Sequence, residues 1–223
     1  MSTSKSSVVD PAGWPVVPQT TNGELSHRTD SDEFGDSARG RVVCVLGVHR
    51  SGTSAATRLI NLLGVYLGAE ECLMGCHPDN PKGYWEYRPI LDLNEEILER
   101  LGGNWHEPPP LAPGWETAPE FADLRQRARD LVAQTFASRD WGWKDPRTCL
   151  TLPFWKAILP PIHYVICMRS PAEVAASLEK REGFPIEKSM RLWQIYTGAA
   201  IEQTAGLPRH LIFYEDVIQS HRE

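Results

Sequence analysis

The sequence has no apolar run that approaches the roughly 20 residues a helix needs to cross a bilayer, so we predict no membrane span. The N-terminus, MSTSKSSVVDPAGWP, also lacks the apolar core of a secretory signal peptide, which predicts a cytoplasmic protein. Excess positive charge is lacking as well, because 29 Asp and Glu outnumber 23 Lys and Arg and give a formal net charge of -6. A nucleic-acid-binding surface needs clustered Lys and Arg, and we therefore expect no nucleic acid among the partners.

A disulfide framework is absent too, since the five cysteines are odd in number and irregularly spaced, as is typical of reduced thiols. Cys72, Cys76 and His77 are potential metal ligands, but no second cluster of ligand residues follows them at a distance. We interpret the two cysteines as ordinary thiols, and we predict no metal ion.

The first 40 residues contain few large aliphatic side chains and are rich in Ser, Thr, Pro and Gly. They carry six acidic residues against three basic ones, a net charge of -3. Such a segment buries too little surface to offset the entropy lost on ordering it. We predict a disordered tail over residues 1–40 and a single folded domain over residues 41–223.

Apolar runs and helical patterns alternate through the predicted domain. The expected strands are 42–46, 140–144, 163–169 and 210–217. The expected helices are the one that ends at Gly64, then 89–102, 121–136, 170–181 and 185–205. Five prolines predict an irregular segment over residues 103–119. This alternation predicts an α/β three-layer sandwich with a central parallel sheet, similar to the P-loop NTPases.

Two of the expected helices have specific predicted features. The apolar side of the first helix carries Ala55, Leu59, Leu62 and Leu63. The helix after residue 169 should be capped by Ser170, begin with Pro171 and close a capping box with Glu173.

The loop after the first strand reads GVHRSGTS, a phosphate-loop pattern with Thr53 where nucleotide hydrolases have lysine. Gly47 and Gly52 allow a tight turn that points backbone N–H groups toward an anion at the helix N-terminus. Arg50 adds a permanent charge and several donors. Because the missing lysine would serve the β- and γ-phosphates of a nucleotide with magnesium, this loop suits a smaller anion.

Polar residues gather at the ends of all four expected strands. The four groups are HRSGTS, KDPR, RSP and YED. Parallel sheets bind ligands beyond the carboxyl ends of their strands, so we expect these groups to form one binding site.

The motifs GVHRSGTSA, KDPR, RSPAEVAAS and FYED resemble, in order and spacing, those of the sulfotransferase family, which uses 3'-phosphoadenosine 5'-phosphosulfate (PAPS). The resemblance covers residues 42–216. It implies that Arg169 and Ser177 bind the 3'-phosphate of PAPS as co-substrate, and that Tyr214 lies near the adenine. The loop residues that it implies around the 5'-phosphosulfate are His49, Arg50, Ser51, Gly52, Thr53 and Ser54.

The resemblance also implies a reaction, in which a hydroxyl or amine of a small-molecule or carbohydrate acceptor attacks sulfur. Arg50, the loop N–H groups and Lys144 would stabilise the charge that grows on the leaving oxygen. The acceptor proton needs a base. Glu86, which lies among aromatic residues in NPKGYWEYR, is our first candidate, followed by Asp145 and then His106.

Two other functions are compatible with a phosphate loop. One is a P-loop phosphotransferase or kinase, which would need magnesium, and the other is a non-catalytic nucleotide-binding module. In the sulfotransferase family a basic, glycine-containing loop follows the YED strand, and this chain ends at Glu223 without one. We therefore expect either a C-terminally truncated domain or an incomplete nucleotide site, and the sequence indicates no oligomeric state.

Overall fold

The computed structural model describes residues 40–219, apart from residues 79 and 138. These residues belong to one compact unit, Asp36–Glu223. The tail predicted over residues 1–40 lies outside the described residues except for Gly40, so its disorder stays a prediction.

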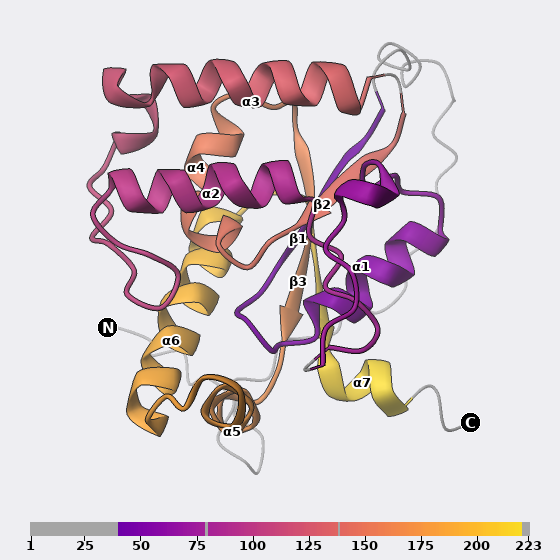
Figure 1. Ribbon diagram of the computed structural model, residues 1–223, viewed down its shortest axis with the longest axis vertical. Coiled ribbons are helices and arrows are strands. Elements are labelled where there is room, and N and C mark those ends of the chain that lie inside the picture. The colour runs from indigo at the N-terminus through magenta and orange to yellow at the C-terminus, as the bar shows by residue number, and fades with distance from the viewer. Residues whose placement is uncertain (1–39, 79, 138, 220–223) are drawn as a thin grey trace, which may run out of the picture. The chain divides into compact units, whose positions relative to one another are not determined.

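A parallel sheet of four strands forms the centre of the described residues (Figure 1). The strands follow the spatial order β2-β1-β3-β4. Their bounds are Val42–Leu46 for β1, Trp141–Lys144 for β2, Ile162–Met168 for β3 and Arg209–Phe213 for β4. Every neighbouring pair is parallel, and Val45 of β1 lies between Lys144 and Val165. The predicted α/β class with a central parallel sheet is confirmed.

Both faces of this sheet are covered, as the alternation of buried side chains along its strands shows. Cys44 and Leu46 of β1 belong to the larger of two apolar clusters, whereas Val45 between them belongs to the smaller one. On β3, Ile166 joins the larger cluster and Cys167 the smaller one. Successive side chains of a strand point to opposite faces, so the two clusters lie on opposite sides of the sheet.

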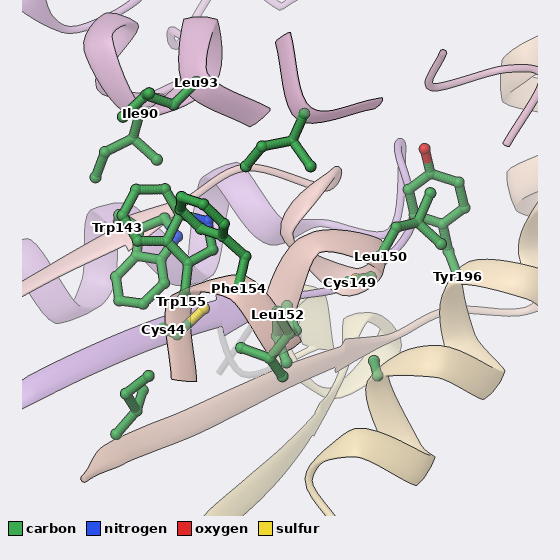
Figure 2. Packing of buried hydrophobic residues seen from close by; sticks show 14 of the residues in the cluster. Cys44, Ile90, Leu93, Trp143, Cys149, Leu150, Leu152, Phe154, Trp155 and Tyr196 are labelled. Atoms are coloured by element: carbon green, nitrogen blue, oxygen red, sulfur yellow. The ribbon is translucent and has the colours of Figure 1, made fainter. Parts of the chain in front are cut away.

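The larger cluster joins the sheet to helices α2 (Arg88–Arg100), α4 (Thr148–Lys156) and α6 (Ile186–Gln203) (Figure 2). Trp143 of β2 and Trp155 of α4 are both fully buried, and their ring centroids lie 5.6 Å apart. A buried aromatic side chain removes about 150–250 Å² from water, an upper estimate of about 4–6 kcal/mol each. This packing holds the end of β2 firmly in place.

Helix α1 (Thr53–Leu62) covers the opposite face, but with a different side from the one that the sequence predicts. Ala56 packs in the smaller cluster, and Ile60 packs against that cluster. The residues of the predicted apolar side are all exposed: Ala55, Leu59, Leu62 and Leu63. The small Ala56 side chain allows α1 to lie close to the sheet, so its larger leucines are left at the surface.

Helix α4 has no counterpart in the sequence prediction, and Pro153 lies inside it. A proline lacks the N–H group and leaves the carbonyl four residues earlier without its usual helical partner. Here that carbonyl, on Cys149, accepts a hydrogen bond from Nε2 of Gln203 at 3.4 Å. A side chain of α6 therefore replaces the bond that the proline removes, and α4 continues to Lys156.

Helix α5 (Pro171–Glu182) begins where the sequence predicts, but the predicted capping box is wrong. Ser170 makes no side-chain cap hydrogen bond within the described residues. Glu173 instead accepts a hydrogen bond from Nε of Arg169 at 2.9 Å. An arginine with a charged fork of donors is a stronger partner for the carboxylate than a backbone N–H group.

The other elements differ little from prediction. Helix α3 spans Ala122–Thr135, and 3-10 turns occur at Glu70–Cys72, Trp115–Thr117 and Pro119–Phe121. The last strand is shorter than predicted, because Tyr214 already begins the short helix α7 (Tyr214–Gln219). None of the helices in the described part of the chain combines the length and apolar character needed to span a bilayer.

Candidate functional site

The polar motifs at the four strand ends meet at one edge of the sheet. β2 lies on one side of β1 and β3 on the other, so the chain changes direction across the sheet at β1. Open α/β sheets bind ligands at such a reversal, outside the carboxyl ends of the strands. The loop after β1 and Arg169 after β3 both lie there.

The loop after β1 is a tight turn with left-handed residues at Arg50 (φ 70°) and Gly52 (φ 92°). The Ser51 hydroxyl donates a hydrogen bond to the carbonyl oxygen of Val48 at 2.7 Å and closes the turn. Helix α1 then begins at Thr53, and no side chain of the described residues caps its first turn. The first N–H groups of a helix have no partner within it, so they are available to an anion.

Tyr214 packs directly on this loop from the end of β4. A Cβ atom added to Gly52 would lie 2.4 Å from Cδ2 of Tyr214, so the contact requires glycine. The guanidinium carbon of Arg169 lies 4.1 Å from the centroid of the same ring, which is a cation–π contact. The tyrosine ring therefore joins the loop to the end of β3.

Arg50, Arg169 and Ser177 form one connected polar group. Nε of Arg50 donates a hydrogen bond to Oγ of Ser177 at 2.9 Å. A terminal nitrogen of Arg169 donates to the carbonyl oxygen of Arg50, also at 2.9 Å. The structure thus brings Arg169 and Ser177 to the same place and adds the loop arginine between them.

Lys144 and Glu86 form a buried ion pair beside the loop. Nζ of Lys144 lies 2.5 Å from Oε1 of Glu86 and 3.2 Å from Oγ of Ser54. The loop lacks a lysine of its own, and the end of β2 supplies an ammonium group in its place. Lys144 exposes 2% of its surface and Glu86 exposes 6%.

The environment of Glu86 shifts the protonation equilibrium of its carboxyl group toward the neutral form. Burial raises the pKa of Glu86 above its ordinary value of 4.5, although the positive charge of Lys144 opposes this rise. The second carboxylate oxygen, Oε2, is buried and has no hydrogen-bond partner among the described residues. A buried acceptor without a partner is uncommon in folded proteins.

Asp145, the second candidate base, belongs to a buried polar network that also includes Asn94 of α2. One carboxylate oxygen accepts a hydrogen bond from Nδ2 of Asn94 at 2.8 Å. The other accepts two from Arg147, one from its guanidinium at 2.9 Å and one from its backbone N–H at 3.1 Å. Both oxygens are therefore occupied, and Asp145 is 1% exposed.

His106, the third candidate base, lies against helix α6. Its Nδ1 is 3.2 Å from Nζ of Lys188, and its ring meets the edge of Trp105 at a centroid distance of 5.2 Å. Neither His106 nor Asp145 borders the cleft that Glu86 and Lys144 line.

His49 is enclosed by aromatic rings and positive charges. Its ring centroid lies 4.4 Å from that of Trp105 and 5.9 Å from that of Tyr196. Burial lowers the pKa of His49 well below its ordinary value of 6.5, and the charges of Arg147 and Arg181 lower it further. The ring is therefore neutral at pH 7, and its Nε2 is buried without a hydrogen-bond partner among the described residues.

A cleft of about 1410 Å³ opens between these groups. Eight basic side chains line it: Arg50, Arg58, Lys82, Lys144, Arg147, Arg169, Lys180 and Arg181. Two acidic side chains, Glu86 and Glu182, line it as well. Since the chain as a whole has a net charge of -6, this concentration of positive charge makes the cleft attractive to anions.

Most of the predicted cofactor-binding residues line this cleft, and two do not. His49, Arg50, Gly52, Thr53, Ser54, Arg169 and Tyr214 line it. Ser51 and Ser177 do not line it; Ser51 donates a hydrogen bond to the carbonyl oxygen of Val48, and Ser177 accepts one from Arg50.

Sequence reasoning missed Asn80, Lys180 and Arg181, which also line the cleft. A signal for Arg181 was present, because it follows Ser177 by four residues and so shares a face of α5 with it. Asn80 donates hydrogen bonds to the carbonyl oxygen of Gly83 at 2.7 Å and to Oγ of Ser54 at 3.4 Å. These contacts link distant segments, and the sequence carries no pattern for them.

The described residues do not support a metal site at Cys72, Cys76 and His77. Cys72 is half-buried and Cys76 is exposed, and no group of three potential ligand side chains in this part of the chain is arranged to hold a metal ion. That the protein uses no metal stays a prediction.

No family model matches the sequence, and a search of curated proteins finds no match either. Solved structures do match. The sulfotransferase domain of the Synechococcus PCC 7002 olefin synthase is similar with a TM-score of 0.51 and 17% identity, over 85% of this chain and 72% of that chain. Sulfotransferase STF1 from Mycobacterium tuberculosis H37Rv matches with a TM-score of 0.43 and 17% identity, over 82% of this chain and 65% of that chain.

At 17% identity the first of these similarities shows the fold alone. The described part of the chain has the α/β fold of a sulfotransferase domain, with a central parallel sheet flanked by helices.

Proposed function

We propose that this protein is a sulfotransferase, which transfers a sulfonate group from PAPS to a hydroxyl or amine of a small-molecule or carbohydrate acceptor. The observation that carries the proposal is the concentration of basic side chains around a strand–loop–helix anion site, in a chain of net charge -6. The fold shared with a sulfotransferase domain supports it.

The 3'-phosphate of PAPS suits Arg169 and Ser177, which both form hydrogen bonds with the loop residue Arg50. A guanidinium offers five N–H donors in a fork that matches phosphate oxygens, and two such forks are joined here. Arg169 is paired with Glu173, whose side chain is 50% exposed and can turn to solvent when a phosphate takes its place. The ring of Tyr214, held against the loop and Arg169, offers a flat surface to the adenine.

The 5'-phosphosulfate suits the other end of the loop. The N–H groups of the first turn of α1 and the ammonium group of Lys144 converge near Ser54, whose hydroxyl lies 3.2 Å from that ammonium. Donors that are already in place at the leaving oxygen lower the barrier, and losing one of them typically costs about 3–4 kcal/mol.

In the proposed reaction a bond forms between the acceptor oxygen or nitrogen and sulfur, while the bond from sulfur to the bridging 5'-phosphate oxygen breaks. The electron pair of the broken bond stays on the bridging oxygen, toward which Lys144 and Arg50 donate hydrogen bonds. The acceptor proton passes to a carboxylate, so the products are the sulfated acceptor and adenosine 3',5'-bisphosphate. No atom is oxidised or reduced.

Glu86 suits the role of the base better than the other candidates. It lines the cleft, its raised pKa lies closer to neutrality than that of an ordinary carboxyl group, and its Oε2 accepts no hydrogen bond from the described residues. Lys144 holds Oε1, which fixes the direction of the carboxylate. Asp145 has both oxygens occupied and His106 lies outside the cleft.

Calorimetric titration tests the proposal directly. We expect adenosine 3',5'-bisphosphate to bind in EDTA more tightly than ATP, and Arg50→Gln to weaken that binding at least tenfold, because it removes a charge-assisted contact. Arg129→Gln removes the same charge from an exposed position on α3 and should change nothing. Binding of ATP alone, and only with magnesium, would indicate a phosphotransferase; binding of neither nucleotide would refute the proposal.

A further inference from the structure

The exposed side of helix α1 forms one wall of the cleft. Ala55, Leu59 and Leu62 are spaced by four and then three residues, so they share one face of the helix. All three line the cleft, where Leu59 is 40% and Leu62 is 65% exposed. Apolar side chains that gather on one face of a cleft, rather than lie scattered, are typical of a surface that a ligand covers.

A loop segment that follows α1 brings two more apolar side chains to the same cleft. Met74 and Trp85 are half-buried and line it, and the backbone N–H of Trp85 donates a hydrogen bond to the carbonyl oxygen of Met74 at 3.1 Å. Two contacts hold this segment against α1. The Ser54 hydroxyl donates to the carbonyl oxygen of Tyr84 at 3.1 Å, and the guanidinium carbon of Arg58 lies 4.7 Å from the ring centroid of Trp85.

These five side chains make up what we call the apolar strip: Ala55, Leu59, Leu62, Met74 and Trp85. Glu86, the candidate base, follows Trp85 directly, and its carbonyl oxygen accepts a hydrogen bond from the N–H of Met74 at 2.8 Å. Lys144 lies 2.5 Å from Glu86 and 3.2 Å from Ser54, the residue before Ala55. The base therefore lies at the Ala55 end of the strip, and Leu62 lies about 10 Å further along the helix axis.

The chemistry of the strip suits an alkyl chain better than a sugar. The polar side chains of α1 beside it are already engaged, because Ser54 donates to the Tyr84 carbonyl and Arg58 donates to Oδ1 of Asn61 at 2.6 Å. A sugar would find few hydrogen-bond partners there for its hydroxyl groups. An alkyl chain needs none, and it gains free energy as its methylene groups and the leucines leave water together.

We propose that the acceptor is an alcohol with an extended alkyl chain, whose hydroxyl lies at Glu86 and whose chain runs along the apolar strip toward Leu62. This inference rests on the proposed function, since it names the acceptor class of the same site. The transfer is the one described above: the alcohol oxygen bonds to sulfur, the bond from sulfur to the bridging oxygen breaks, and the hydroxyl proton passes to Glu86.

A homologous series of alcohols tests the inference by calorimetry on the protein saturated with adenosine 3',5'-bisphosphate. The series is 1-hexanol, 1-octanol and 1-decanol. We expect the affinity to rise about twofold to fourfold for each added methylene, the range between half and full burial of that group. From 1-hexanol to 1-decanol the gain should be at least roughly tenfold, and methyl α-glucoside, the carbohydrate comparison, should bind more weakly than 1-decanol.

Two neighbouring leucines supply the variant and its matched control. Leu62→Asn should weaken binding of 1-decanol about fourfold or more, the contribution of one buried methylene, and should affect 1-hexanol less, because the shorter chain reaches less far along the strip. Leu63 is 84% exposed and does not line the cleft, so Leu63→Asn should change neither affinity. Both positions are exposed, and both variants should fold.

Three results of these titrations overturn the inference: affinity that does not depend on chain length, equal effects of Leu62→Asn and Leu63→Asn, or tighter binding of the glucoside. Sedimentation of the free protein tests the other way to cover the strip. A dimer that Leu62→Asn dissociates and Leu63→Asn does not would mean that a second copy covers the strip, which also overturns the inference.

The two proposals fail in distinguishable ways. When the bisphosphate binds and the alcohols show no dependence on chain length, the acceptor class is wrong and the sulfotransferase proposal stands. When the bisphosphate does not bind, the sulfotransferase proposal fails, and the acceptor class fails with it.

Discussion

Replacing Glu86 by glutamine should separate chemistry from binding. Glutamine keeps the size of the side chain and one acceptor oxygen for Lys144, but it cannot take a proton. General-base catalysis typically contributes about 10²–10⁴-fold, so kcat should fall by that factor while the affinity for the nucleotide changes little. The raised pKa of Glu86 provides a second test, the pH dependence of kcat, because the carboxylate must be ionised to act as a base.

The pH dependence of kcat follows from this requirement. In the wild-type protein kcat should rise with pH through the raised pKa of Glu86, so that its acid limb has a midpoint above the ordinary value of 4.5. In Glu86→Gln that limb should disappear. The fold should survive, because Lys144 retains a neutral acceptor. We expect the free energy of unfolding to fall by about 1–3 kcal/mol, which is less than the roughly 3–5 kcal/mol lost when one partner of a buried ion pair is removed.

Asp145→Asn is the comparison variant, because it distinguishes loss of the base from loss of a structural carboxylate. Its carboxylate oxygens are bound by Asn94 and Arg147, so the structure predicts a loss of stability of up to about 3–5 kcal/mol with normal turnover per folded molecule. Single-turnover release of the bisphosphate, with a simple phenol as the hydroxyl acceptor, gives the rate, and urea unfolding gives the stability. If Asp145→Asn stops turnover and Glu86→Gln does not, our assignment is wrong; if both turn over normally, His106 is the next residue to replace.

Two further substitutions test the proposed roles of Arg169 and His49. Arg169→Ala should weaken binding of adenosine 3',5'-bisphosphate roughly tenfold to a hundredfold and spare adenosine 5'-phosphosulfate, which lacks the 3'-phosphate; an equal loss for both would mean that Arg169 only supports the fold. His49 has a lowered pKa in the folded state and an ordinary value of 6.5 when unfolded, so only the unfolded chain takes up its proton as the pH falls below 6.5. Wild-type stability should therefore fall by up to about 1.4 kcal/mol per pH unit there, and urea unfolding at pH 7.5 and 5.5 should show a smaller fall for His49→Gln; equal falls would contradict the assignment.

Local patterns in the sequence were enough to predict the sheet and the loop. Val42–Leu46 is apolar throughout because it is covered on both faces, and Gly47 and Gly52 mark the turn that follows it. Such features depend on neighbouring residues alone. The same local reasoning failed for α4, because the compensation for Pro153 comes from Gln203, fifty residues further along the chain.

Side-chain partners were less predictable than elements, since they depend on how distant segments pack. The sequence could place Arg169 and Ser177 two helical turns apart, but it gave no sign that Arg50 joins them. It could rank Glu86 as a base among aromatic residues, but the decisive contact with Lys144 spans 58 positions. The exposed leucines of α1 show the same limit, because helix periodicity alone does not identify which side of a helix meets the sheet.

The left-handed backbone of Arg50 has a consequence for how fast an anion can bind. A non-glycine residue with φ near 70° is strained by about 1–3 kcal/mol, and it persists only where its surroundings hold it. Here Ser177 holds its side chain and Arg169 holds its carbonyl oxygen, so the turn is formed by folding itself. The entropy of ordering the loop is lost before a ligand arrives, and association should then be limited by diffusion and electrostatic attraction rather than by a slow closure of the loop.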